Sequence, residues 1–187
     1  VIDLRRCVGC HTCAIACKSE NKVPLGVFRS WVIQVEKGEY PDVSTSNLPR
    51  LCNHCAFPPC VIACPTRARY QREDGVVLTR YERCIGCKAC IAACPYDAIF
   101  IHPIDKVAHK CTFCDHKIAG GHDPACVAAC PARARIFGDL NDPESAVSKI
   151  VSTTSVTVLR PEARTEPMVF YIAADASIMM RIREKIG

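Results

Sequence analysis

The chain has 187 residues, of which 24 are Lys or Arg and 19 are Asp or Glu, so its formal net charge is +5. No stretch approaches the roughly 18 uninterrupted apolar residues that a membrane-spanning helix needs. No signal-peptide pattern is visible, although Val1 is not expected to be the natural start, and no RNP-like, zinc-finger or basic-helix signature indicates nucleic-acid binding. Sixteen residues are cysteines, a share at which a short chain is usually a disulfide scaffold or a metal protein.

The sixteen cysteines form four groups of four, and none is left over. The first group follows a short apolar run at residues 1–4 and has the spacing C-x2-C-x2-C-x3-C, which the third group repeats after a similar run at residues 75–79. The second and fourth groups lengthen the gap between their second and third cysteines. In chain order the groups are Cys7, Cys10, Cys13 and Cys17; Cys52, Cys55, Cys60 and Cys64; Cys84, Cys87, Cys90 and Cys94; and Cys111, Cys114, Cys126 and Cys130.

The third group, with Pro95 after its last cysteine, carries the C-x2-C-x2-C-x3-C-P run of bacterial ferredoxins, whose thiolates hold a [4Fe–4S] cluster. Three thiolates spaced two residues apart let one tight loop reach three corners of the cube, while the fourth ligates the neighbouring cluster. Gly86 lets the backbone adopt an unusual φ beside the cluster, and Pro95 turns the chain away from it. Four groups therefore predict four [4Fe–4S] clusters.

Disulfides and structural zinc are weaker interpretations of the same cysteines. Cysteines repeated along one loop are poor disulfide partners, and structural zinc prefers two separated C-x2-C pairs, with no use for a repeated Cys-Pro ending. Each oxidised cluster with its thiolates carries a charge of about −2, so four clusters change the net charge from +5 to about −3. The basic residues are then expected to balance buried clusters.

Short strands are expected around each cysteine group. Residues 1–4 and 75–79 predict strands that lead into a cluster loop. Residues 68–70, 98–101 and 134–137, each shortly after a Cys-Pro pair, predict strands that return over a cluster.

An internal repeat joins the second and fourth groups, because residues 60–69 closely match residues 126–135. The repeat indicates duplicated two-cluster units with little core of their own, so metal ligation must supply much of the folding free energy. Between the first two groups, residues 18–51 form an insertion with an expected strand at 31–35 and turns at 37–38 and 40–41.

The rest of the chain carries few signals of chemistry. Residues 115–125 contain His and Gly and predict a surface loop; because every cysteine group is already complete, the histidines are not expected to be ligands. Asp142 as N-cap before Pro143 predicts a helix to about Val151. Further along, 156–159 and 168–172 predict strands or extended docking segments, and 178–185 fits a basic amphipathic helix or, more simply, a tail that docks on a partner.

With these residues the chain resembles the four-cluster iron–sulfur (beta) subunits of the molybdopterin oxidoreductase superfamily, the dimethyl-sulfoxide-reductase type. Within that family it is most similar to the polysulfide/thiosulfate reductase and respiratory arsenate reductase small subunits. The resemblance spans most of the chain and is carried by residues 7–10, 51–55, 84–88, 111–116 and 137–143. Some relatives replace one cluster cysteine, whereas this chain keeps all sixteen, and formate-dehydrogenase-type relatives add a membrane helix that this sequence does not show.

The resemblance implies an α+β fold of two bacterial-ferredoxin-like domains with two [4Fe–4S] clusters each, the second domain inserted in the first. The expected divisions are 1–48 plus 103–140, 49–102, and a cysteine-free C-terminal docking extension at 141–187. The fourth cysteine of each group is implied to cross to the neighbouring cluster. The implied ligand sets are Cys7, Cys10, Cys13 and Cys130; Cys111, Cys114, Cys126 and Cys17; Cys52, Cys55, Cys60 and Cys94; and Cys84, Cys87, Cys90 and Cys64.

The implied function is that of an electron-transfer subunit with no catalytic residue of its own. Substrate chemistry would occur at a molybdenum or tungsten bis-pterin cofactor in a catalytic partner, and electrons would pass to or from a quinone-reactive integral-membrane subunit or a soluble carrier. Such a chain is membrane-associated through its partners, on the periplasmic side in most relatives, and the cytoplasmic side is the alternative location. The alternative is a free-standing soluble polyferredoxin, against which the insertion at 18–51 and the cysteine-free tail both speak.

The basic residues within three positions of predicted ligands include Lys18, Lys88, Arg67 and Arg133. Their charges would raise the reduction potentials of nearby clusters, although solvated surface charge is the simpler interpretation.

Overall fold

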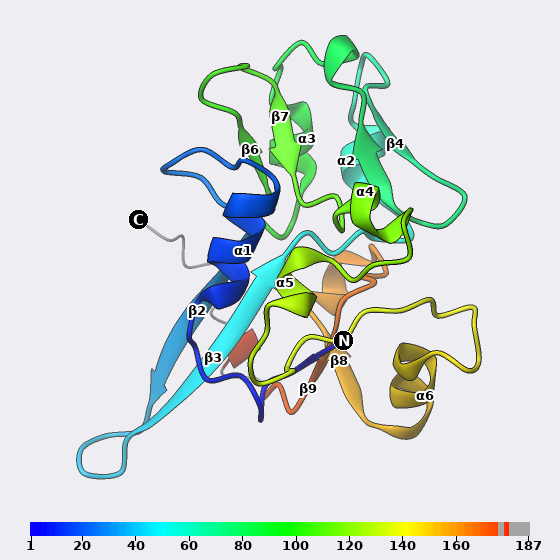
Figure 1. Ribbon diagram of the computed structural model, residues 1–187. Coiled ribbons are helices and arrows are strands. Elements are labelled where there is room, and N and C mark those ends of the chain that lie inside the picture. The colour runs from blue at the N-terminus through cyan, green and yellow to red at the C-terminus, as the bar shows by residue number, and fades with distance from the viewer. Residues whose placement is uncertain (176–177, 180–187) are drawn as a thin grey trace.

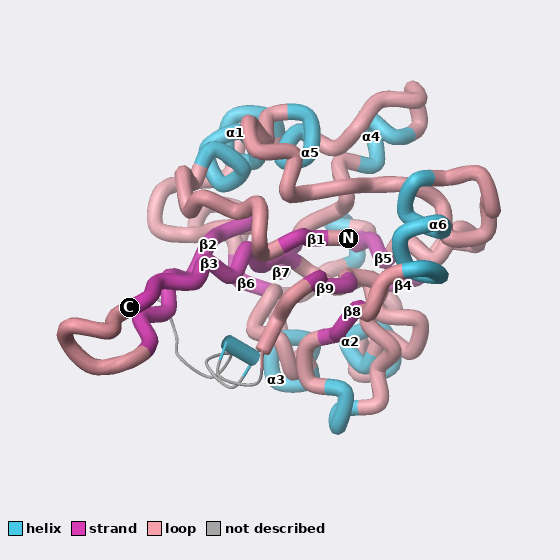
Figure 2. The backbone as a smooth tube through the Cα atoms, turned by 90° about the horizontal axis from the view of Figure 1, so that it is seen from below, coloured by secondary structure: helices cyan, strands magenta, loops and turns pink. Residues whose placement is uncertain are grey.

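The computed structural model describes residues 1–175 and 178–179 and combines short helices with short strands. Figure 2 shows the strands in a central layer, with α1 and α5 on one side and α2 and α3 on the other. The bounds of these helices are α1 Thr12–Glu20, α2 Pro59–Ile62, α3 Ala89–Ala93 and α5 Ala125–Ala128. Over the residues that the structure describes, none of the helices has the length and apolar character to cross a bilayer.

The two helix pairs bring the cysteine groups together two by two. Helix α1 begins after His11, at φ 57, and α3 begins after Lys88, at φ 65. In both groups the residue directly after the second cysteine therefore has a left-handed φ. Helix α1 packs against α5, and α2 packs against α3. The first group therefore lies with the fourth, and the second group with the third.

Two small antiparallel hairpins lie in the middle of the chain. Strands β4 (Arg69–Gln71) and β5 (Val77–Thr79) pair antiparallel, as do β6 (Ile99–Ile101) and β7 (Ala108–Lys110). The strands predicted at 68–70, 75–79 and 98–101 are confirmed. Strand β5 then leads through the single-turn 3₁₀ helix η1, Tyr81–Arg83, into the third cysteine group.

A longer hairpin of β2 (Ser30–Lys37) and β3 (Ser44–Leu51) is paired over its whole length. Figure 1 shows it, in blue and cyan, reaching away from the rest of the chain. The strand predicted at 31–35 is confirmed. Strand β3 was not predicted; it is held by burial of Leu48, which is 0% exposed, and by the Tyr171 hydroxyl, which donates to the carbonyl oxygen of Pro49 at 3.0 Å.

The cysteine-free C-terminal segment packs on the chain itself. Strand β9 (Phe170–Ile172) lies between β1 (Ile2–Asp3), to which it is parallel, and β8 (Val156–Val158), to which it is antiparallel. These strands match the segments predicted at 1–4, 156–159 and 168–172. Between β8 and β9, after the single-turn 3₁₀ helix η2 (Pro161–Ala163), the polypeptide also bonds to the loop of the second cysteine group. There the carbonyl oxygens of Thr165 and Glu166 accept from the backbone N–H groups of Phe57 and Ala56.

Three details of the prediction were wrong. Helix α6 (Ala146–Thr153) starts later than expected because Ser145 is its N-cap, its hydroxyl accepting from the Ser148 N–H at 3.1 Å, while Asp142 closes a turn before it. The loop predicted at 115–125 contains the helical turn α4, Asp115–Ile118. The strand predicted at 134–137 is reduced to a single bridge between Arg135 and Ile2. The helix considered at 178–185 falls largely outside the described residues.

Candidate iron–sulfur cluster sites

Two of the predicted ligand sets each line one cavity. One small cavity is lined by all four cysteines of the set called quartet C, and a second small cavity by all four of quartet D. Quartet C comprises Cys52, Cys55, Cys60 and Cys94, and quartet D comprises Cys64, Cys84, Cys87 and Cys90. Each quartet takes three cysteines from one group and its fourth from the other, so the polypeptide crosses over between the two sites.

The other two predicted sets lie where α1 packs against α5. Quartet B comprises Cys17, Cys111, Cys114 and Cys126, and quartet A comprises Cys7, Cys10, Cys13 and Cys130. All four cysteines of quartet B line one larger cavity. Burial, with smaller contributions from Cys13 and Cys130, raises the pKa of Cys7, so these three thiols of quartet A are neighbours, while Cys10 is exposed at the outer edge of the loop.

One amide also joins the first group to the fourth. The Asn21 side-chain nitrogen lies 3.8 Å from the Sγ of Cys17 and 3.5 Å from the Sγ of Cys114. Its own carbonyl oxygen accepts from Arg29 Nη1 at 3.0 Å, which fixes the orientation of the amide. Asn21 is therefore a hydrogen-bond donor to the sulfurs of quartet B.

Buried side chains connect the four quartets in the order D, C, B, A. One apolar cluster contains cysteines of D and C, a second contains cysteines of C and B, and a third contains cysteines of B and A. The cysteines that share a cluster are Cys90 and Cys60 in the first, Cys52 and Cys55 with Cys111 in the second, and Cys126 and Cys13 in the third. The exposed thiols, Cys87 in D and Cys10 in A, belong to the two ends of this order.

The donor set fits four iron–sulfur clusters. All sixteen cysteines lie in the described part of the molecule and are free thiols, and Cys₄ sets are the usual ligands of [4Fe–4S] clusters. Backbone N–H groups donate to several of the sulfurs, a type of contact that stabilises cluster thiolates. The donor–acceptor pairs are Ala108 N to Cys84 Sγ at 3.4 Å, Phe113 N to Cys111 Sγ at 3.4 Å, and Ala134 N to Cys130 Sγ at 3.3 Å.

Three buried cationic side chains also fit the presence of iron–sulfur clusters. Arg69, Lys110 and Arg135 are at most 5% exposed, and none of them forms an ion pair with a carboxylate of the described residues. Buried cations require a compensating negative charge. Clusters of net negative charge, when bound, would supply it at the places where these side chains lie.

Without iron the buried thiols would stay protonated at neutral pH. Burial raises the pKa of Cys17 and Cys60 to about 12 and that of Cys55 to about 11. Ligation by a metal deprotonates such thiols outright. These buried cysteines are therefore suited to ligation and unsuited to acting as free nucleophiles.

Gly86→Ala is expected to destabilise the loop of quartet D more than Gly75→Ala destabilises the β4–β5 turn. Both glycines have a left-handed φ, +68° and +81°, where an alanine costs about 1–3 kcal/mol. Only at Gly86 would the added Cβ also meet the backbone, at 2.5 Å from the carbonyl oxygen of Lys106, whereas nothing lies within 4 Å at Gly75. Thermal unfolding of the iron-loaded protein should show at least about 1 kcal/mol of extra loss for Gly86→Ala. Equal losses would contradict the close approach.

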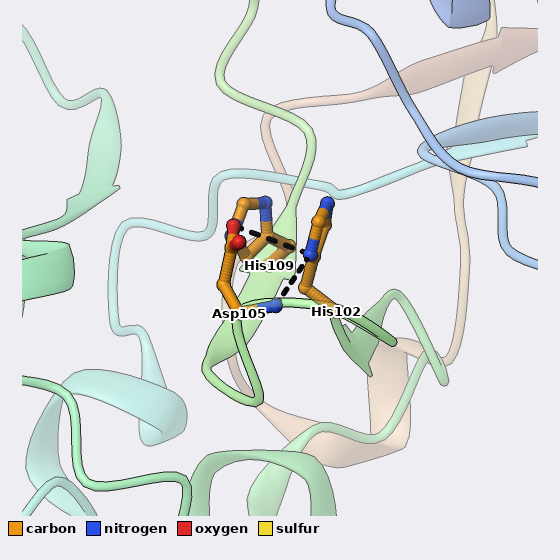
Figure 3. Close-up of side chains that lie close together, drawn as sticks. All are labelled: His102, Asp105 and His109. Carbon is orange, nitrogen blue, oxygen red and sulfur yellow. Dashed lines mark hydrogen bonds and ion pairs between the residues drawn. The ribbon is translucent and has the colours of Figure 1, made fainter.

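A group of His102, Asp105 and His109 lies at the end of the β6–β7 hairpin (Figure 3). Ala108, next to His109, donates to Cys84 of quartet D. Arg29 donates from Nη2 to Nδ1 of His109 at 3.1 Å, and since a guanidinium only donates, the ring proton of neutral His109 is on Nε2. That Nε2 faces the Asp105 carboxylate at 3.8 Å and offers no lone pair to a metal. The group therefore closes the hairpin, and the adjacent guanidinium disfavours a cation there.

Of the basic residues singled out from the sequence, Lys88 lines the cavity of quartet D, and the other three do not line it. Arg67, Lys88 and Arg133 are exposed, and Lys18 donates to the carbonyl oxygens of Pro24 and Val27, both at 2.7 Å. Sequence reasoning missed the buried cations, of which two, Arg69 and Arg135, are related by the internal repeat. The repeat was the signal that could have found them.

Comparison with known proteins agrees with this geometry. The family described as 4Fe-4S dicluster domain matches residues 43–140, and the 4Fe-4S binding domain matches residues 5–21. The B subunit of tetrathionate reductase from Salmonella typhimurium is 48% identical over 179 residues, which cover 94% of this chain and 72% of that protein. The B subunit of polysulfide reductase from Wolinella succinogenes is 43% identical over 175 residues, which cover 91% of either protein.

A third relative is also matched over most of its length. The arsenate respiratory reductase iron-sulfur subunit ArrB of Shewanella sp. is 38% identical over 221 residues, which cover 92% of this chain and 94% of that protein. The chain therefore belongs to the family of iron–sulfur beta subunits of molybdopterin oxidoreductases that carry the 4Fe-4S dicluster domain.

Proposed function

We propose that the chain relays electrons along four [4Fe–4S] clusters held by quartets D, C, B and A. Each cluster, when bound, takes up and gives back one electron. The single observation that carries the proposal is the packing order of the quartets, in which buried side chains connect each quartet to the next and an exposed thiol stands at each end.

The chain's own residues would hold, shield and orient the clusters. The sixteen thiolates ligate iron, with the fourth cysteine of each group crossing over, and the cavities at C and D that each join cysteines of two groups support this. Backbone N–H groups and the Asn21 amide donate to the sulfurs, which favours the negatively charged, reduced state. Burial of the inner thiols excludes water from the path.

The ends of the path suit two protein partners. Val8 and Ile85 occupy the same place in the two outer loops and are 68% and 69% exposed, beside the exposed thiols Cys10 and Cys87. Exposed apolar side chains around a surface-reaching redox centre fit contact with another protein. One partner is a catalytic subunit with a molybdenum or tungsten bis-pterin cofactor, and the other is a quinone-reactive membrane subunit or a soluble carrier, which would attach the chain to the membrane on the periplasmic side.

The proposed domain organisation is two ferredoxin-like units with a docked extension. Residues 49–102 form the inserted unit, 1–48 plus 103–140 the outer unit, and 141–187 the extension. The packing of α1 on α5 and of α2 on α3 supports this division, and the β6–β7 pairing crosses its boundary at residue 102.

The direction of electron flow follows from the catalytic partner. The relatives include reductases and, at 42% identity over 194 residues, the B subunit of sulfite dehydrogenase from Allochromatium vinosum. The same path of clusters thus fits a partner that consumes electrons and one that supplies them. All of these relatives are named as parts of an enzyme with more than one polypeptide, which favours a complex over a free-standing polyferredoxin.

Affinity purification from native membranes under anaerobic conditions, with metal analysis, tests the proposal. Molybdenum or tungsten should co-purify with about sixteen irons per chain, four for each cluster. A lone chain with sixteen irons would instead identify a polyferredoxin. Stoichiometric zinc with little iron would overturn both.

A further inference from the structure

Two arginines stand at equivalent positions of the internal repeat and are buried at both. Arg69 follows Cys64 by five residues and Arg135 follows Cys130 by five, and their side chains are 2% and 5% exposed. The arginine two residues earlier in each copy is exposed. The repeat therefore buries one guanidinium in each two-cluster unit, which is unfavourable unless negative charge lies beside it.

Arg69 lies between quartets D and C. It starts β4 and lines the cavity of quartet D. Its three guanidinium nitrogens are buried and make no hydrogen bond of good geometry to a described residue. Burial alone would lower the pKa of Arg69, but Cys90 of quartet D, and then Cys60 and Cys52 of quartet C, raise it further than burial lowers it. Sulfurs of both sites are thus among the groups that act on this guanidinium.

Arg135 lies in the same way between quartets B and A. Its Nη1 is 3.8 Å from the Sγ of Cys126 in quartet B, and its Nη2 donates to the hydroxyl of Ser30 at 3.0 Å. Against the effect of burial, Cys126 and then Cys13 of quartet A raise the pKa of Arg135. Arg135 also opposes the rise in the pKa of Cys7 of quartet A.

We propose that Arg69 and Arg135 set the reduction potentials of the clusters, each raising the potentials of the two clusters that flank it. The inference rests on the proposed function, since it requires all four clusters. Each cluster takes up one electron with no bond made or broken, so its charge with four thiolates changes from about −2 to about −3. A buried cation stabilises the more negative, reduced form, and from a position between two clusters it also weakens their mutual repulsion when both are reduced.

Potentiometric titration followed by electron paramagnetic resonance tests the proposal on the protein purified with its clusters. Arg69→Gln should lower the potentials of the two clusters of quartets C and D together, and Arg135→Gln those of A and B. At a fixed potential the ratio of reduced to oxidised cluster should fall at least tenfold, which is 59 mV for one electron. Arg69→Lys and Arg135→Lys keep the charge and should restore most of the shift.

Arg67→Gln and Arg133→Gln are the matched controls, because each removes one positive charge from the same repeat two residues away at an exposed position. Unchanged potentials in the Arg69 and Arg135 variants, shifts confined to one cluster of a unit, or equal shifts in the controls would overturn the proposal. If the Gln variants lose the flanking clusters while the Lys variants retain all four, the counter-charge role is supported. If the Lys variants lose clusters too, the arginines act through their shape and not their charge, and the proposal is overturned. Iron analysis of the unmutated protein is read separately, since a count well below sixteen contradicts the proposed function and not the role of the arginines.

Discussion

Combining Cys94→Ala with Cys52→Ala is expected to remove one cluster, whereas combining it with Cys84→Ala is expected to remove two. Cys94 follows Cys84 in the sequence but lines the cavity of quartet C with Cys52. Both substitutions of the first pair therefore damage the same site, while the second pair damages quartets C and D. Since each cluster holds four irons, iron should fall from about sixteen per chain to about twelve in the first variant and about eight in the second.

The mirror-image pairs at Cys64 control for general instability. Cys64 lines the cavity of quartet D, so Cys64→Ala with Cys84→Ala should cost one cluster, and with Cys52→Ala two. Iron analysis and spin counting after full reduction measure all four variants. If Cys94→Ala with Cys84→Ala keeps about twelve irons while the pair with Cys52→Ala keeps about eight, each group closes its own cluster and the crossover is wrong.

The cysteine spacing was the most informative part of the sequence. A run of cysteines two residues apart fixes a tight loop, and a final Cys-Pro fixes how the backbone leaves it. The strands after Cys64 and Cys94 follow because β-branched and aromatic residues recur there, but β7, the partner of β6, was not predicted. The pairing of the groups did not follow from spacing, because it depends on which helices pack together, a long-range property of the fold.

Strand β3 shows what local patterns leave out. Its sequence, STSNLPRL, combines Ser, Asn and Pro, which strands disfavour. Pro49 is tolerated because the sheet has two strands and each is an edge. The strand exists because β2 offers a complete partner and because Leu48 and Leu51 are buried, and neither condition is visible within the segment.

The arginines of the internal repeat show the same limit of local sequence patterns at the cluster sites. In a regular strand, residues two apart face the same side, so Arg67 and Arg69 would be expected to share one environment. Arg67 has φ 52 and Arg133 has φ 48, both left-handed, so the strand pattern begins only after them. This turn leaves the first arginine of each pair in solvent and directs the second inward.

Removing the iron is expected to abolish cooperative unfolding of the protein. Three of the apolar clusters that hold the elements together include ligand cysteines themselves. Within the described residues, three of the four sheets have only two strands, and the longest helix, α1, has nine residues. Structural metal sites contribute about 10 kcal/mol or more to folding, and a domain of this kind has a net stability of about 5–15 kcal/mol. The loss of four clusters, together with buried guanidiniums left without counter-charge, exceeds that margin.

Circular dichroism and the fluorescence of Trp31, the single tryptophan, measure the effect after anaerobic oxidation with a strong iron chelator. The protein treated with oxidant or chelator alone is the control and should keep both its iron and its transition. Adding ferrous iron and sulfide should restore the transition, whereas zinc alone should not, because four thiolates arranged around a cube are too far apart to close a single tetrahedral ion. An iron-free chain that still unfolds cooperatively at the temperature of the loaded protein would show that the polypeptide, and not its clusters, supplies the folding free energy.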